Sequence, residues 1–482
     1  MGKYFAYSGH YLEPEITAFD KLCGILEKNF IADHGKKPNR LELATELYMY
    51  AHECERVEAI DAFDLQVKVI TRFYKKKPSQ DERIEAFVLA ATAELIASGE
   101  VPYAPGYRTY AADYHPIALA DCDGWDQGTP EQQAKWRAMR QKYGVGGSEN
   151  AAIHGISPFS NNIAVYNNKV GIEKVKNEVD KNTQFIFDYG HAMEEPIANY
   201  FAATHNVKVW NDTIMYRHPY YPWMIADLDR RAEMFNEDGT SYDALIEIKT
   251  ASFKKKEQWE GSHVPEYYVS QLRHYMAVMN IDTTYICCHF GGNTADEMVF
   301  RRVKRIKSIE EMMCDVVKNF WLNNVLPLNP PVPNGSGEVQ ADVSYYYAKM
   351  ADVDRPQIAL PQSVKGVIER IMDLKEQVAQ IKSKTGALGK LEDEILLNQQ
   401  ILKDMLGETT EGVCDCDGKT FYMVTYKPNS RASVDKEGLK IAYPDIYDRY
   451  VKENPENSRT MRISVKNKTK NWVMPQNAPA TP

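Results

Sequence analysis

A short segment near the middle of the chain, LIEIKTAS at residues 245–252, most constrains how this sequence can fold. Ile246 and Ile248 alternate with Glu247 and Lys249, so a β-strand here would place both charges on one face. Burying such charges inside a domain costs free energy unless they have partners. The segment therefore fits either a surface hairpin with cross-strand ion pairs or a strand that borders a charged functional site.

An aspartate upstream favours the functional site. Asp229 ends an apolar run in PWMIADLDRRAE, residues 222–233. Together, the carboxylates of Asp229 and Glu247 would form a hard-oxygen pocket suited to Mg²⁺ or Mn²⁺. Lys249 beside them could orient or deprotonate a water and stabilise a phosphorane-like transition state. Such triplets also arise by chance, so this pattern alone leaves the surface hairpin open.

Two further segments carry candidate site residues. We expect GHAMEEP, residues 190–196, to open a helix, which places Glu194 and Glu195 in its first turn. The helix dipole alone would explain acidic residues there, so a site role is one of two interpretations. The Gly-rich turn GVGGSE, residues 144–149, would open another helix and offer N–H groups to an anion, although an ordinary tight turn explains it too. Arg137 and Arg140 just upstream favour a phosphate.

Hydrophobic periodicity predicts an α/β core between helical flanks. Apolar residues recur three or four apart over residues 16–100, with Asn39 as a candidate cap, whereas residues 101–130 resemble loop. Strands are expected at 208–219, 243–252 and 283–292, and helices at 135–155 and 266–280. Residues 182–206 are expected to be a loop that leads into an amphipathic helix.

At 482 residues the chain is long enough for about three domains. In order, we expect a helical accessory domain at 1–128, the α/β core at 129–330, a Pro/Gly-rich linker at 331–361, a helical hairpin or coiled coil at 362–408, and a small β-rich tail at 409–482 that includes a short helix near 439–451.

The net charge of −9 taken alone discourages a nucleic-acid partner, because phosphate contacts need Lys and Arg. The total charge hides local basic clusters that could contact phosphates. They are Lys75–Lys77, Lys254–Lys256, and Arg301, Arg302, Lys304, Arg305 and Lys307. Eight Cys are too few for a disulfide scaffold and none form a four-Cys set, so we expect no Fe–S cluster and no structural zinc. Without a signal peptide or membrane span, we expect a cytoplasmic protein.

Six blocks in order resemble a known family: GVGGSENAAIHGISPFSN, YGHAMEEPIANYF, HPYYPWMIADLDRRAE, LIEIKTAS, PEYYVSQLRHYMAVMN and YICCHFGGN. They look like the YqaJ-like viral recombinase family, which is related to the lambda-type alkaline exonucleases of the PD-(D/E)XK nuclease superfamily. The resemblance spans about residues 135–300. It implies a restriction-endonuclease-like core, a central mixed sheet flanked by helices, with a helical N-terminal domain and a C-terminal coiled coil plus small α+β tail.

The resemblance also implies roles for individual residues. Metal would be bound by Asp229, Glu247, the backbone carbonyl of Ile248 and Glu194, while Lys249 would position or activate the attacking water. Where the family usually has Asp-Gly, this chain has Asp229-Arg230, which leaves Asp227 as a rival ligand, and Glu195 is the rival of Glu194. The residues implied to contact DNA or its 5′-phosphate are Ser148, Arg140, Arg137, Gln271 and Tyr275.

By resemblance, the chain would be a Mg²⁺-dependent deoxyribonuclease, a phage or prophage 5′→3′ exonuclease on double-stranded DNA ends, with Mn²⁺ as an alternative metal. Such proteins act in recombination with a single-strand annealing protein and form homo-oligomeric rings. Two alternatives remain: an endonuclease of the same superfamily from a defence or DNA-processing system, and a non-catalytic DNA-binding or interaction protein.

Overall fold

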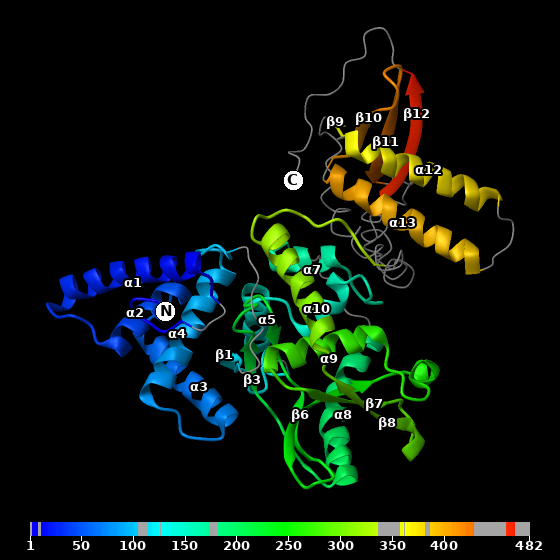
Figure 1. The fold of residues 1–482 in the computed structure, drawn as a ribbon. Coiled ribbons are helices and arrows are strands. Elements are labelled where there is room, and N and C mark those ends of the chain that lie inside the picture. Colours follow the sequence, from blue (N-terminus) through cyan, green and yellow to red (C-terminus); the bar gives the residue numbers. More distant parts are fainter. Residues whose placement is uncertain are drawn as a thin grey trace, which may run out of the picture. The chain divides into compact units, whose positions relative to one another are not determined.

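The computed structural model describes residues 2–7, 11–104, 114–125, 127–172, 181–335, 357–360, 362–380, 386–407, 409–428 and 459–467 (Figure 1). The chain divides into two compact units, which are described separately. The first comprises Met1–Ile156, Lys169–Gly171 and Asp180–Asn329, and the second comprises Ser157–Asn168, Ile172–Val179 and Pro330–Pro482. The boundary expected near residue 128 lies inside the first unit.

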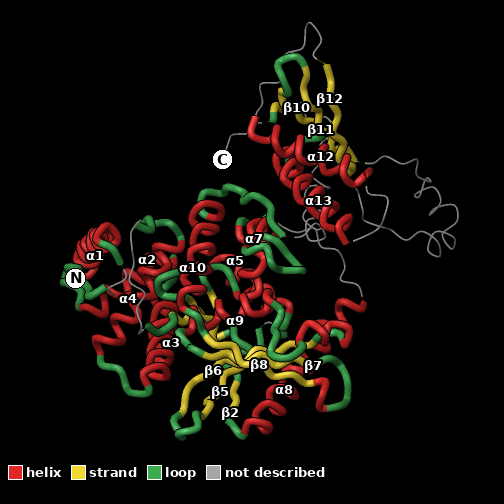
Figure 2. Tube along the Cα trace, turned by 45° about the vertical axis from the view of Figure 1, so that its right-hand side comes forward, coloured by secondary structure: helices red, strands yellow, loops and turns green. Residues whose placement is uncertain are grey.

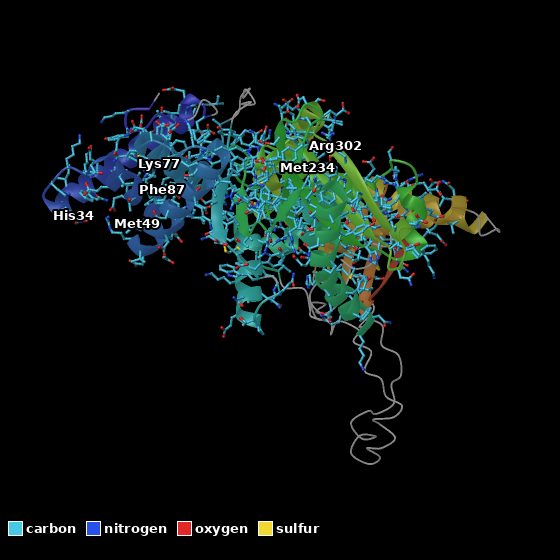
Figure 3. The ribbon with its side chains drawn as sticks, turned by 90° about the horizontal axis from the view of Figure 1, so that it is seen from below. His34, Met49, Lys77, Phe87, Met234 and Arg302 are labelled. Atoms are coloured by element: carbon cyan, nitrogen blue, oxygen red, sulfur yellow. The ribbon has the colours of Figure 1, made fainter. Side chains whose placement is uncertain are left out.

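Four helices form the N-terminal part of the first unit, in agreement with the periodicity of residues 16–100. The side chain of Asn39 caps the second helix by accepting a hydrogen bond from the amide of Glu42, as predicted. Phe87, labelled in Figure 3, is fully buried and stacks on Tyr48 with ring centroids 4.5 Å apart. The helices are α1 (Glu13–His34), α2 (Arg40–His52), α3 (Arg56–Tyr74) and α4 (Gln80–Ala97).

The centre of the first unit is a five-stranded mixed sheet in the order β2-β5-β6-β7-β8. The strand β6 pairs antiparallel with β5 and parallel with β7, while the outer pairs are antiparallel. The predicted strands at 243–252 and 283–292 are therefore the middle of the sheet. The strands are β2 (Lys208–Trp210), β5 (Arg230–Phe235), β6 (Ser241–Thr250), β7 (Thr283–His289) and β8 (Met298–Lys304).

One helix covers each face of this sheet. Ile246 and Ile248 point toward α8 (Lys181–His205), where they pack with Ile197 and Phe201 in an apolar cluster. Glu247 points the other way, toward α9 (Glu266–Met279). The alternation in LIEIKTAS thus separates an apolar face from a charged face, as its period of two predicts. The tube view in Figure 2 shows α8 beside the sheet.

A second, three-stranded sheet has the order β1-β3-β4 and was only partly predicted. The segment expected to be one strand at 208–219 forms two, β2 and β3 (Ile214–Arg217), which belong to different sheets. The expectation of loop throughout 101–130 is wrong, because β1 (Ile117–Asp121) pairs with β3. The short, Ala-rich sequence of β1 carries little strand signal. The third strand is β4 (Ile225–Ala226).

The helix that carries Glu194 begins earlier than expected. α8 starts at Lys181, so Gly190 and Glu194 lie in its interior rather than in its first turn. The prediction of a loop before Gly190 is therefore wrong, and the helix dipole does not explain Glu194. The apolar residues Phe185, Ile186 and Phe187 continue the helix but stay exposed, which is why they gave no amphipathic signal.

In the second unit, two helices pack against each other and against a four-stranded sheet. Ile368 and Ile371, in the segment predicted to be a helical hairpin or coiled coil, contribute to the core that the helices share with the sheet. The predicted β-rich tail does contain strands, whereas the helix expected near 439–451 lies outside the described residues. The elements are α12 (Lys365–Gln380), α13 (Gly386–Leu406), β9 (Ile358–Ala359), β10 (Glu411–Asp415), β11 (Thr420–Pro428) and β12 (Arg459–Asn467).

None of the described helices combines the length and the apolar character that crossing a membrane requires.

Candidate active site

Asp229 and Glu247 come together at the junction of β5 and β6. Arg230 stands opposite Ile246 in the antiparallel ladder, so Asp229, which precedes it, lies beside Glu247. The amide of Ile248 donates a hydrogen bond of 2.8 Å to Oδ2 of Asp229. Both carboxylates line a cleft of about 480 Å³, together with Lys249. The hairpin interpretation of these charges is therefore wrong, because they border a cleft.

Glu247 is an almost fully buried charge in the wall of the cleft. The residue is only 3% exposed. Its Oε1 accepts a 2.6 Å hydrogen bond from Nε2 of Gln271 and forms an ion pair with Nζ of Lys249. Burial raises the pKa of Glu247 to about 8, and the nearby charges of Asp229 and Glu194 act in the same direction. Three carboxylates therefore crowd one small region, and a cation bound there would relieve their repulsion.

Lys249 is the cation of this group. Burial alone would lower its pKa, but the charges of Glu247 and Asp229 raise the pKa above the usual lysine value. Its side chain remains 24% exposed and its Nζ lies 5.8 Å from the ring centroid of Tyr268. Lys249 is thus a charged ammonium that a bound phosphate or water could reach.

The two glutamates of α8 have different surroundings. Glu194 lines the cleft, and its side chain is 22% exposed. Glu195 is 68% exposed and pairs with Nη2 of Arg230 at 3.2 Å, outside the cleft lining. Nη1 of the same Arg230 lies 3.9 Å from Oε2 of Glu194. This geometry favours Glu194 over Glu195 as the site carboxylate of the helix.

Asp227 also lines the cleft but is held differently from Asp229. Its Oδ2 accepts a 2.5 Å hydrogen bond from the indole Nε1 of Trp136, on α5 (Pro130–Tyr143). Asp229 instead bonds to the backbone of β6 through Oδ2, next to Glu247. The geometry therefore favours Asp229 over Asp227 as the partner of Glu247.

Oxygen donors in the cleft suit a small divalent cation. Carboxylates of Asp229, Glu247 and Glu194 line one space, and hard oxygen ligands are those that Mg²⁺ and Mn²⁺ take. As placed, no three His, Cys, Asp or Glu side chains in the described part of the chain form a ready metal-holding group. The role expected for the carbonyl of Ile248 stays a prediction.

The Gly-rich turn packs closely against its neighbours. The amide of Val145 bonds to the carbonyl of Trp223, and the amide of Gly146 donates to Oε2 of Glu149 at 2.8 Å. A Cβ on Gly144, where φ is +152°, would lie 2.4 Å from the carbonyl oxygen of Trp223. The glycines thus permit close contact, and the tight-turn interpretation accounts for them.

Arg140 and Ser148 do meet at the cleft. Nη2 of Arg140 lies 3.4 Å from Oγ of Ser148, and both residues line the cleft with Gln271 and Tyr275. Arg137 is exposed on α5 and is not among the lining residues, so the structure does not bring it to this site. Arg140 and Ser148 therefore form the cationic, hydroxyl-bearing end of a cleft that is otherwise rich in carboxylates.

The structure adds wall residues that the sequence did not reveal. Asp212 lines the cleft but is only 2% exposed and is paired with Arg72 of α3 and with Arg231. Trp136, which holds Asp227, was also missed. Both come from segments distant in sequence from β6, and neither carries a motif of its own.

The basic clusters of the sequence lie elsewhere. None of their residues is among those that line the cleft. Lys75 is 3.6 Å from Asp243, Lys256 is 3.2 Å from Glu297, and Arg305 is buried against Glu310. Lys77 and Arg302 are labelled in Figure 3. A role for these clusters in contacting DNA stays a prediction.

Comparison with known proteins finds a similarity over the region that carries most of this cleft. The family model described as a YqaJ-like viral recombinase domain matches residues 135–285. This part of the chain is similar to YqaJ-like viral recombinase domains. The matched range contains Arg140, Ser148, Glu194, Asp229 and Glu247.

Relatives resemble more of the chain than the YqaJ-like domain alone. The uncharacterized protein YqaJ of Bacillus subtilis (strain 168) is 25% identical over 321 residues, which cover 66% of this chain and 91% of that protein. Among solved structures, an alkaline exonuclease from Laribacter hongkongensis, alone and in complex with dAMP, is similar with a TM-score of 0.31 and 16% identity. Each match covers 45% of this chain and 97% of the exonuclease chain.

Proposed function

We propose that this protein is a metal-dependent deoxyribonuclease that degrades double-stranded DNA from its ends during recombination. One observation carries the proposal: Asp229, Glu247 and Lys249 converge in one cleft inside the YqaJ-like domain, with Arg140 and Ser148 at the same cleft. Carboxylates that can hold a cation, beside a lysine and an arginine, suit the hydrolysis of a phosphodiester, in which negative charge develops on the phosphate oxygens.

Each side chain has a distinct part in this proposal. Asp229, Glu247 and Glu194 would hold a divalent cation, Mg²⁺ or Mn²⁺, which when bound activates water and polarises the phosphate. Lys249 would hold the attacking water and balance the charge on the phosphate, while Gln271 orients Glu247 through its 2.6 Å hydrogen bond. Water adds to phosphorus, one P–O ester bond breaks, and the leaving oxygen takes up a proton.

Cleavage of linear duplex DNA tests the activity. We expect purified protein to release nucleotides in the presence of Mg²⁺ or Mn²⁺ and to stop when EDTA is added. Glu247→Gln should reduce the rate by at least about a hundredfold, because it removes a carboxylate that would hold the divalent cation. Glu195→Gln is the matched control, since Glu195 is exposed outside the cleft lining. Full activity of Glu247→Gln would contradict the proposal.

Choice of DNA substrate separates the modes of action. A 5′→3′ exonuclease degrades a linear duplex from a free 5′ end, and we expect the Arg140 and Ser148 end of the cleft to contact that terminal phosphate. Strand-specific end labels would show the polarity. Cutting of closed circular DNA would favour an endonuclease instead, and binding without cleavage would favour a non-catalytic protein.

Assembly and partners complete the proposal. We propose a homo-oligomeric ring around DNA that works with a single-strand annealing protein, as the family resemblance implies, in a phage or prophage setting. Light scattering of the purified protein would give its mass in solution. Co-purification with an annealing protein from the same genome would test the partner.

A further inference from the structure

A buried lysine lies behind the cleft and has no part in the chemistry proposed above. The side chain of Lys169, which belongs to the first unit, is 0% exposed. Its Nζ lies 2.8 Å from Oε2 of Glu149 and donates a 2.9 Å hydrogen bond to the carbonyl oxygen of Arg140. A buried ammonium is costly unless it is paired, so the surrounding fold is arranged around this contact.

This contact joins the two segments that carry Arg140 and Ser148. Arg140 lies in the last turn of α5, where a helix leaves its carbonyl groups without intrahelical partners, and Lys169 supplies the missing donor. Glu149 directly follows Ser148, and its Oε2 accepts bonds from both Lys169 and the amide of Gly146. One ammonium thus holds the end of α5 against the start of α6 (Gly147–Ile153).

The space around Arg140 leaves little freedom for this arrangement to change. Nη2 of Arg140 would lie only 2.4 Å from a Cβ on Gly146, so the guanidinium occupies the space that this glycine leaves open. The guanidinium also lies 4.7 Å from the ring centroid of Trp136. Burial alone would raise the pKa of Glu149, but the charges of Lys169 and Arg140 hold it below its usual value. Glu149 is therefore the anion that stabilises both cations, whose own charges repel each other.

We infer that Lys169 is a positioning residue. Through Glu149 and the Arg140 carbonyl it fixes the spacing of Arg140 and Ser148. This spacing makes the cleft selective for DNA ends that carry a 5′-phosphate. The inference rests on the proposed function. Lys169 does not contact DNA; it acts through the two residues that do. Loss of its charge should release the turn and reduce phosphate recognition, while the carboxylate end around Glu247 keeps its own bonds to Gln271 and Lys249.

The test compares 5′-phosphorylated with 5′-hydroxyl duplexes in wild type and three variants. Lys169→Met keeps the length of the side chain without its charge, and Glu149→Gln keeps an acceptor for the Gly146 amide but loses the ion pair. Lys142→Met, an exposed lysine of α5 that does not line the cleft, is the matched control. We expect Lys169→Met and Glu149→Gln to lower the preference for the phosphorylated end by at least about tenfold, since small misplacements of binding groups are that costly.

Two readouts keep the outcomes distinct. Cleavage rates give the phosphate preference in the active protein, and fluorescence anisotropy with each duplex in EDTA gives it without catalysis. The inference would be overturned if the folded variants lost activity equally on 5′-phosphorylated and 5′-hydroxyl duplexes, or if their preference for the phosphorylated end were unchanged. A wild-type protein that does not distinguish the two duplexes would also overturn it. A wild type that binds phosphorylated ends selectively but never cleaves would overturn the proposed function and leave the inference standing. If Lys169→Met does not fold, Glu149→Gln decides.

Discussion

The backbone amide of Ile248 donates a 2.8 Å hydrogen bond to Oδ2 of Asp229. This bond ties the residue that precedes β5 to the strand that carries Glu247 and Lys249. The aspartate therefore keeps a fixed place in the cleft, with its second oxygen left to face a ligand. Asp227, only two residues earlier, is directed to Trp136 instead.

We expect Asp229→Asn and Asp227→Asn to differ sharply. Asp229→Asn should lower DNA cleavage by at least about a hundredfold, because it removes a carboxylate that would hold the divalent cation beside Glu247. Asp227→Asn should cost less than about tenfold, because an amide oxygen can still accept the hydrogen bond from Trp136. Initial cleavage rates on linear duplex at saturating Mg²⁺ give both values. An equal loss of cleavage rate in the two variants would contradict the assignment of Asp229, rather than Asp227, as the metal ligand.

Close packing at Gly147 makes a second prediction. A Cβ there would lie 2.5 Å from Cε1 of Tyr275 and 3.0 Å from Cγ of Gln271, the residue that bonds to Glu247. Gly147→Ala should therefore displace Gln271 and reduce cleavage by about a hundredfold, in proportion to a shift of about 1 Å at the site.

Gly190→Ala is the control for Gly147→Ala. Gly190 lies inside α8, and its added Cβ would meet Thr250 Oγ1 at an ordinary 3.6 Å. Because Ala is the better helix former, we expect this variant to gain up to about 1 kcal/mol in unfolding free energy and to keep its activity. Comparable activity in the two alanine variants would show that the turn tolerates movement.

The buried ion pair between Glu94 of α4 and Arg217 of β3 should be strongly coupled. Their side chains are 6% and 1% exposed, and Arg217 also donates to the carbonyl of Tyr143 at 2.9 Å. Removing one partner leaves an uncompensated buried charge, so Glu94→Leu or Arg217→Met alone should cost about 3–5 kcal/mol. The double variant should recover most of that loss. Urea unfolding of all four proteins measures the coupling, and additive losses would refute it.

Two buried histidines should make the first unit sensitive to acid. Burial lowers the pKa of both His52 and His274 to about 4, from an ordinary value of 6.5. The unfolded chain takes up these protons near pH 6.5 and the folded chain does not, so their contribution to stability is present above pH 6.5 and is lost as the pH falls toward 4. Each histidine should contribute about 1.4 kcal/mol per pH unit across that window.

The His52→Phe variant isolates one of these contributions. The His52 ring stacks on Tyr48 with centroids 4.0 Å apart, and a phenyl ring can keep that contact. The difference in unfolding free energy between wild type and variant should therefore grow in favour of the variant as the pH falls from 6.5 to 4. A difference that stays constant with pH would mean that His52 does not titrate in this way.

The strands and helices that were predicted best are those whose pattern is set by the core. LIEIKTAS and TTYICCHFGG became β6 and β7, because strict alternation or a continuous apolar run specifies a buried strand. The start of α8 was predicted too late. Its first turns expose the apolar residues Phe185, Ile186 and Phe187, and this sequence pattern is typical of neither a core helix nor a polar loop.

The candidate site was predictable only where its residues are near one another in sequence or in a family motif. Glu247, Lys249 and Asp229 met as expected, whereas Asp212, Trp136 and Lys169 reach the cleft region from distant segments. The Gly-rich turn illustrates a second limit. Its glycines allow close contact with Trp223 and Tyr275, but the same sequence could also form a turn that binds an anion.

The Glu94–Arg217 pair has a consequence for modularity. Gln66 bonds to the backbone of Ala118, and Trp321 donates its indole N–H to the carbonyl of Ala97, so the N-terminal helices and the rest of the first unit share interior contacts as well as this charge pair. A chain shortened to begin at residue 129 would keep Arg217 without its counter-charge. The four helices therefore cannot be removed or replaced without destabilising the rest of the first unit. A chimaera with a related protein should have its junction outside the first unit.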